Sequence, residues 1–210
     1  GKRVASGDRK GGLRLWDTLS GEELHSVEVG KEYVSALAFF PGSEAVAIGC
    51  YDKTLRVLNA IDGTLRVLRK GEHSVASVAV SADGRRVAVG GSRGQVELVE
   101  VESGAVLSSW TADRSTVEGV AFLADGRLLT AGSGSRGIAV WNVATGERLS
   151  GSEKQFDTIY GFGVTPDGAV RDEEAEDAEA DTAESNNAPD EAGRRSSFRS
   201  VDGDSDNADE

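Results

Sequence analysis

Four short apolar runs recur along the chain at steps of 42, 41 and 42 residues, and this period constrains the fold more than any other feature. The runs are LRLWD (13–17), LRVLN (55–59), VELVE (96–100) and IAVWN (138–142). The glycines that follow the runs keep the same steps, and so do the glycines that precede them: Gly21, Gly63, Gly104 and Gly146 follow, and Gly7, Gly49, Gly90 and Gly132 precede. A fixed period of about 20 to 50 residues indicates a tandem array of one supersecondary unit.

Each period has the pattern of four short strands. In the second period these are YVSALAFF (33–40), EAVAIG (44–49), TLRVLN (54–59) and GTLRVL (63–68). Apolar residues alternate with small or polar ones, and turn residues separate the runs, which is typical of an antiparallel meander. Because no segment keeps a 3.6-residue apolar period, we expect no crossover helices. Four antiparallel strands in radial repetition predict an all-β fold, a β-propeller of four-stranded blades with about four blades' worth present.

The residues at the repeated positions resemble the sequence pattern of the WD-repeat family over residues 1–168. The resemblance rests on the Trp16-Asp17 pair, on the order ASGD…LRLWD (5–17), on the SG, DG and TG turns after the runs, and on the ADG and PDG turns. The family usually carries a Gly-His pair before each inner strand. Here those places hold Val29-Gly30, Lys70-Gly71, Ala112-Asp113 and Lys154-Gln155. The family's turn Asp survives only as Asp52, so we expect no complete polar network in any blade and stabilisation by apolar packing.

The repeat pattern ends after PDGAV (166–170), which divides the chain into a partial WD-repeat-like propeller, 1–170, and an acidic C-terminal tail, 171–210. The tail holds 15 Asp and Glu against 4 Lys and Arg, whereas the rest holds 21 against 19. With so few large apolar residues, the tail is predicted to be disordered. It contains one basic island, RRSSFRS (194–200), where a kinase directed by basic residues could phosphorylate Ser196 or Ser197; the alternative is a solvated linker.

The count of predicted strands leaves the closure of the propeller open. The chain begins at a second strand (3–7) and the pattern ends after an inner strand (158–164), which gives 16 strands. The terminal inner strand could complete the first blade and close a ring of four. Alternatively, the array is an incomplete part of a longer propeller, and we expect this because the pattern is lost within a blade.

Several function classes find little support in the composition. A nearly neutral body with an acidic tail argues against nucleic-acid binding, and no apolar run approaches the ~18 residues of a membrane helix. The single cysteine, Cys50, suits a reducing compartment, so we expect an intracellular location in cytoplasm or nucleus. GSGSRG (132–137) leads into a strand rather than a helix, which argues against a dinucleotide loop. His25 and His73 lack companions at metal spacing, so we expect no catalytic residues, cofactor, metal or small-molecule substrate.

The resemblance implies that a partner protein docks on the rim where the inner strands begin and the turns between second and third strands emerge. The candidate partner-binding residues there are Arg9, Tyr33, Tyr51, Glu118 and Tyr160. All three tyrosines of the chain fall in this set. Tyrosine anchors interfaces with a large amphipathic surface, although it also favours strand ends for purely structural reasons.

The sequence therefore predicts a non-enzymatic scaffold or adaptor for protein–protein interaction, with the tyrosines as anchors and Arg9 and Glu118 as orienting charges. Two alternatives stay open. One is a propeller-fold enzyme with a ligand or metal in the channel. The other is a non-functional truncated fragment of a longer propeller.

Overall fold

A computed structural model describes residues 1–134 and 137–152 of the chain. The chain divides into two units at Val170 and Arg171, and all described residues lie in the first. The predicted inner strand 158–164, the predicted disordered tail, Tyr160, Ser196 and Ser197 all lie outside the described residues.

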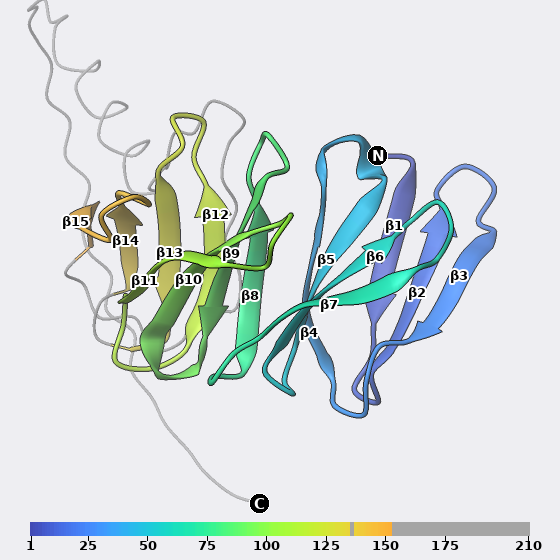
Figure 1. The fold of residues 1–210 in the computed structure, drawn as a ribbon, viewed down its shortest axis with the longest axis horizontal. Coiled ribbons are helices and arrows are strands. Elements are labelled where there is room, and N and C mark those ends of the chain that lie inside the picture. Colours follow the sequence, from blue (N-terminus) through green and yellow to red (C-terminus); the bar gives the residue numbers. More distant parts are fainter. Residues whose placement is uncertain (135–136, 153–210) are drawn as a thin grey trace, which may run out of the picture. The chain divides into compact units, whose positions relative to one another are not determined.

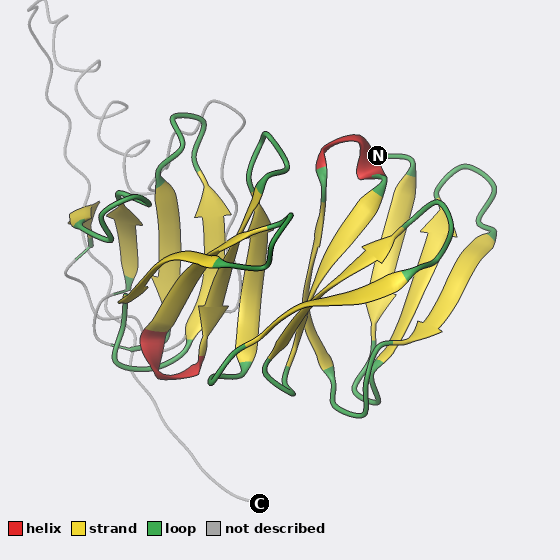
Figure 2. Ribbon diagram, viewed as in Figure 1, coloured by secondary structure: helices red, strands yellow, loops and turns green. Residues whose placement is uncertain are grey.

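The described residues form fifteen strands in four antiparallel sheets, each built from consecutive strands (Figures 1 and 2). The first sheet has β1 (Arg3–Gly7), β2 (Gly12–Asp17) and β3 (Glu23–Glu28). The second has β4 (Val34–Phe39), β5 (Ala45–Cys50), β6 (Thr54–Asn59) and β7 (Leu65–Lys70). The third has β8 (Val75–Val80), β9 (Arg86–Gly91), β10 (Gln95–Glu100) and β11 (Val106–Thr111). The fourth has β12 (Val117–Phe122), β13 (Leu128–Gly132), β14 (Ile138–Trp141) and β15 (Arg148–Gly151). Two short 3-10 turns, η1 (Pro41–Ser43) and η2 (Ser92–Gly94), complete the described elements.

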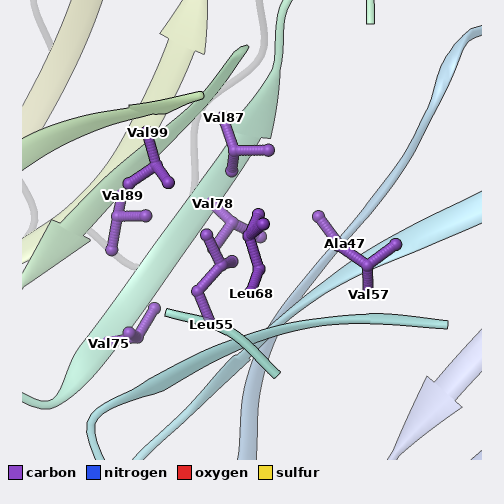
Figure 3. Packing of buried hydrophobic residues seen from close by; sticks show 9 residues of the cluster. All are labelled: Ala47, Leu55, Val57, Leu68, Val75, Val78, Val87, Val89 and Val99. Atoms are coloured by element: carbon purple, nitrogen blue, oxygen red, sulfur yellow. The ribbon is translucent and has the colours of Figure 1, made fainter. Parts of the chain in front are cut away.

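The sheets pack face to face in chain order because successive side chains of a strand point to opposite faces. Along β5, Val46 and Ile48 pack with the first sheet, whereas Ala47 packs toward the third. Figure 3 shows the second of these interfaces, where Leu55 and Leu68 meet a group of valines from the third sheet. Successive apolar side chains of a strand thus pack alternately against the two neighbouring blades, which is the origin of the alternating pattern in the sequence.

The periodic glycines have distinct physical causes. A Cβ on Gly49 would lie 2.4 Å from Cγ1 of Val75, the first residue of the next inner strand, and a Cβ on Gly7 would lie 2.5 Å from Val34 in the same way. Glycine is needed there because the next blade approaches the backbone closely. The glycines of the turns that lead to the outer strands have φ between 70° and 74°, a conformation that other residues rarely adopt.

The predicted all-β propeller of antiparallel blades is confirmed, with about four blades' worth of strands. Among the described residues the first sheet has three strands and lacks an inner one. No helix in the described part of the chain is long and apolar enough to cross a membrane.

Candidate functional site

One rim of the propeller is organised by a backbone hydrogen bond that recurs in the second, third and fourth sheets. In each of them it ties the turn between the second and third strands to the connection before the inner strand. The amide of Tyr51 donates to the carbonyl of Tyr33 at 3.1 Å. Ser92 donates to Ser74 at 3.0 Å in the same way. We call this edge the tyrosine rim; it comprises the β1–β2, β5–β6, β9–β10 and β13–β14 turns and the β3–β4, β7–β8 and β11–β12 connections. It is the lower edge in Figure 2, where η2 lies.

A polar network braces the β5–β6 turn of the tyrosine rim. Asp52 accepts a hydrogen bond from the amide of Thr54 at 3.1 Å and forms an ion pair with Arg56 at 2.8 Å. Arg56 also donates to the sulfur of Cys50 at 3.2 Å. Burial opposes ionisation of Asp52, but the Thr54 hydrogen bonds and the Arg56 guanidinium outweigh it and hold the pKa of Asp52 below its usual value. Burial raises the pKa of the Cys50 thiol, against the opposing effect of Arg56, so the neutral thiol is favoured.

This network corrects the expectation that the blades rely on apolar packing alone. The place where the WD-repeat pattern has its histidine is Gly30, and a Cβ there would lie 3.0 Å from Nη1 of Arg56. Arg56, on β6, thus pairs with Asp52 and fills the space that a histidine at position 30 would occupy. A second polar link joins the neighbouring blades, where Arg69 binds Glu97 through two hydrogen bonds of 2.7 and 2.8 Å.

The structure brings two of the five predicted partner-binding residues, Tyr33 and Tyr51, into direct contact. The rings of Tyr33 and Tyr51 stack with centroids 4.5 Å apart and planes 23° from parallel. Burial raises the pKa of the Tyr33 phenol; Tyr51 and Glu118 raise it further, whereas Arg9 lowers it, so both charged groups act on this ring. Tyr51 is 47% exposed, and Arg9 and Glu118 are exposed too. We call the stacked rings the tyrosine pair.

The hydroxyl groups of the inner strands serve the fold rather than the surface. The hydroxyl oxygen of Ser35, two positions after Tyr33, lies 2.6 Å from the carbonyl oxygen of Val75 and 3.0 Å from that of Gly49, so its single proton lies between these two acceptors. In the next inner strand Ser77, which matches Ala36 rather than Ser35 in register, donates to the carbonyl of Val117 at 2.9 Å. The contacts with Val75 and Val117 join neighbouring blades at the inner strands.

The inner strands β4, β8 and β12 line a hollow of about 350 Å³. Its lining consists mainly of small and apolar side chains, such as Ala36, Ala76 and Gly119, and among the described residues that line it Glu118 alone is ionisable. Among the described residues, no group of three or more His, Cys, Asp or Glu side chains is placed to hold a metal ion. The described residues that line the hollow include no pair of ionisable side chains that could act as acid and base.

Sequence reasoning missed Lys53 at this rim. Lys53 immediately precedes β6, and its backbone has a φ of 72°. Its counterparts in the first and third repeats are Gly11 and Gly94, whereas the fourth repeat has Arg136, which lies outside the described residues. The replacement of a recurrent glycine by lysine could have been found by comparing the repeats position by position.

Comparisons with known proteins agree with the repeat pattern. The family described as WD domain, G-beta repeat matches residues 21–59 and 104–142, and the family described as Anaphase-promoting complex subunit 4 WD40 domain matches residues 66–122. These matches together cover more than half of the chain.

Curated relatives include WD repeat-containing protein 55 of Arabidopsis thaliana, 32% identical over 98 residues, and its namesake of Bos taurus, 30% identical over 96 residues. Each alignment covers 45% of this chain and only 27% or 25% of the relative, so the chain matches about a quarter of the relatives' length.

Two solved structures share the fold. A chain of the mitotic checkpoint complex superposes with a TM-score of 0.66 at 21% identity, over 73% of this chain and 48% of that one. The computationally designed Ika8 protein gives a TM-score of 0.64 at 25% identity, over 74% and 48%. Sequence matches, repeat register and blade architecture agree, and the chain belongs to the WD-repeat family.

Proposed function

We propose that this chain is a non-enzymatic scaffold whose partner protein docks on the tyrosine rim, with the tyrosine pair as its apolar anchor. WD-repeat proteins are typically protein-interaction scaffolds, and the finer assignment rests on one observation. Two tyrosines from different connections stack on each other at the rim while one of them stays 47% exposed. Stacked aromatic rings offer contact area that loses little conformational freedom on binding.

The surroundings of the tyrosine pair support a docking role. The turn that carries Tyr51 is braced by Asp52 and Arg56, so the ring is held before a partner arrives. Arg9 and Glu118 supply one charge of each sign near Tyr33, which would fix the orientation of a bound segment. We place this docking in the cytoplasm or nucleus, where a reduced thiol such as Cys50 persists.

The test compares two double variants of the full chain in affinity capture, with the bound proteins quantified by mass spectrometry. Tyr33→Ala/Tyr51→Ala removes the anchor. Ile61→Ala/Leu107→Ala removes two apolar side chains that are 62% and 51% exposed and lie away from the tyrosine rim. We expect the tyrosine variant to lose specific partners that the wild type and the control variant retain, with thermal melts showing that all three proteins are folded. A folded tyrosine variant with an unchanged set of partners would falsify the proposal.

A further inference from the structure

Each of the described inner strands β4, β8 and β12 has a β-bulge at its second residue. The register that pairs the inner strand with the second strand of its blade skips one residue there: Ser35 in β4, Ala76 in β8 and Glu118 in β12. A bulge bends its strand and changes the direction of a side chain, and bulges are common beside functional sites. The same irregularity at the same level of three successive blades indicates a place where side chains are presented for a purpose.

All three bulged residues line the hollow of about 350 Å³ between the inner strands, but they bring different chemistry to it. The hydroxyl of Ser35 is already engaged with two backbone carbonyls. Ala76 has only a methyl group, whereas Glu118 has a carboxylate. The equivalent residue of the next period, Tyr160, lies outside the described residues. Among the described bulges, Glu118 is thus the one that brings a charge to the hollow.

The carboxylate of Glu118 has no counter-charge in the described part of the chain. Glu118 is exposed, and none of the ion pairs between described residues involves it. The described residues that line the hollow include no Lys, Arg or His, and Arg9, the cation predicted to orient a partner, is not among them. The hollow therefore favours a positive group that comes from another molecule.

The rest of the lining suits the alkyl part of a long cationic side chain. Ala36, Ala76 and Gly119 are small, and Val78 and Val120 add apolar surface. Lysine and arginine lay their apolar stems along such a surface and keep the charged group at a polar end. A hollow of about 350 Å³ lies at the lower end of the roughly 300 to 1,000 Å³ of pockets for small molecules, so it suits a single side chain.

The hollow lies within reach of a segment that docks on the tyrosine pair. Ser35, which lines the hollow, follows Tyr33 by two residues, a distance of about 7 Å along an extended chain. The charge of Glu118 also raises the pKa of the Tyr33 phenol, so the two groups lie within electrostatic reach of each other. Two neighbouring side chains of one partner segment can therefore occupy both places.

We infer that the hollow between β4, β8 and β12 receives an arginine or lysine side chain of the partner segment that docks on the tyrosine pair, with Glu118 binding the cationic group. This inference rests on the proposed function and adds the chemistry of the partner. Glu118 is a specificity-determining residue, because the tyrosine pair alone would accept segments of either charge, whereas the carboxylate attracts a basic segment and repels an acidic one.

Three fluorescein-labelled peptides test the inference. Each contains a Trp for the tyrosine pair and, two residues later, arginine, its neutral analogue citrulline or glutamate, with Gly and Ser at the other positions. Their affinities for the full chain are measured by fluorescence anisotropy at low and high salt. We expect the arginine peptide to bind about two- to fivefold more tightly than the citrulline peptide at low salt, with a smaller ratio at high salt. A glutamate peptide that binds as tightly as the arginine peptide would overturn the inference.

Two matched variants separate Glu118 from the overall acidity of the chain. Glu118→Gln removes the carboxylate at the hollow, and Glu102→Gln removes an exposed carboxylate from the β10–β11 turn, at the opposite edge of its sheet. Both variants lose the same charge. We expect Glu118→Gln to bring the affinities of the arginine and citrulline peptides close together and Glu102→Gln to keep the wild-type ratio. An unchanged ratio in Glu118→Gln, or an equal fall in both variants, contradicts a specific role of Glu118.

A third variant tests the hollow itself. Ala76→Leu adds apolar bulk to the lining and keeps Glu118. We expect it to weaken the arginine and citrulline peptides alike, because the side chain at that position loses its space, while a thermal melt shows that the variant is folded. Wild-type affinity for both peptides in folded Ala76→Leu would mean that the hollow does not receive the side chain.

The outcomes distinguish this inference from the proposed function. If the arginine and citrulline peptides bind the wild type equally, the preference for a basic segment is wrong. The proposed function survives that result as long as Tyr33→Ala/Tyr51→Ala weakens both peptides. If the tyrosine variant binds both peptides as the wild type does, the docking site itself is wrong, and the inference falls with it. No measurable binding of the arginine peptide at millimolar protein concentration also overturns the inference.

Discussion

The ion pair between Asp52 and Arg56 should contribute more to stability than a shorter ion pair on the surface of the same protein. Its oxygen and nitrogen are 2.8 Å apart, with the two side chains 25% and 11% exposed. The Asp125–Arg127 pair is shorter, at 2.6 Å, but its side chains are 50% and 46% exposed. Solvent screens the second pair far more than the first, so burial rather than distance decides the difference.

Asp52→Asn tests this contrast because asparagine can still accept the Thr54 hydrogen bond but leaves Arg56 without a counter-charge. Breaking a fully buried pair costs about 3 to 5 kcal/mol, and an exposed pair contributes about 0.2 to 1 kcal/mol. For a pair that is about three-quarters buried or more, we expect the free energy of unfolding to fall by about 2 to 3 kcal/mol. With a urea m-value of about 2 kcal/mol/M, the unfolding midpoint falls by about 1 to 1.5 M.

Urea unfolding followed by tryptophan fluorescence measures the midpoints of Asp52→Asn and of the matched control Asp125→Asn, whose midpoint should fall by no more than about 0.5 M. The double variant Asp52→Asn/Arg56→Met should recover part of the loss, because it leaves no buried unpaired charge. Equal shifts for the two single variants, or a further loss in the double variant, would refute the reasoning.

The same network makes a prediction about pH. The folded-state pKa of Asp52 lies below its unfolded value of about 3.9, so the carboxylate contributes stability above that pH and the contribution is lost as the pH falls through the folded-state pKa. The difference in stability between wild type and Asp52→Asn should therefore be largest near neutral pH and shrink below about pH 4.

Two further predictions concern the frame that supports the site. Thr130→Val removes the acceptor of the Trp141 indole N–H, a 2.8 Å bond between residues that are each 3% exposed, and should lower the free energy of unfolding by about 1 to 3 kcal/mol in thermal or urea melts. Gly49→Ala would place a Cβ 2.4 Å from Val75 and should cost about 1 to 3 kcal/mol, whereas Gly71→Ala, whose nearest atom is 3.7 Å away, should melt near the wild-type temperature. Unchanged stability of Gly49→Ala would mean that adjacent blades do not depend on close approach at this glycine.

The strands could be predicted from the sequence because their cause is local and repeats along the chain. The run TLRVLN (54–59) coincides with β6, and YVSALAFF (33–40) contains β4 with one extra residue at each end. Alternating side chains that face two neighbouring blades leave a period of two in the sequence, and four copies in register remove most of the ambiguity that a single short run would have.

The polar network could not be predicted in the same way, because its partners come together only after folding. Arg56 reaches back to Asp52 across a turn and lies against Gly30, which belongs to the connection before the blade's inner strand. The sequence shows only that glycine stands where the WD-repeat pattern has histidine, and nothing near position 30 indicates that Arg56 of β6 fills the space. The repeat register predicts that Tyr33 and Tyr51 lie at the same rim. Their stacking depends on the lateral distance between two connections, which the register does not determine.

The tyrosine rim shows how equivalent repeats can produce a surface that is not equivalent along its length. The backbone pattern recurs in the bonds from Tyr51 to Tyr33, from Ser92 to Ser74 and from Ser133 to Thr116, so the second, third and fourth repeats each provide a tied turn. Side chains that point outward from these turns are free of that constraint and can differ. The second repeat places an aromatic ring and a cation on either side of Asp52, the residue that braces the turn. A rigid turn loses little conformational entropy when a partner binds. Exposed side chains on a turn that is held by its own hydrogen bonds are therefore the best candidates for recognition. In the described rim this coincidence is found in residues 50–54, and partner selection should therefore depend on this turn more than on its counterparts.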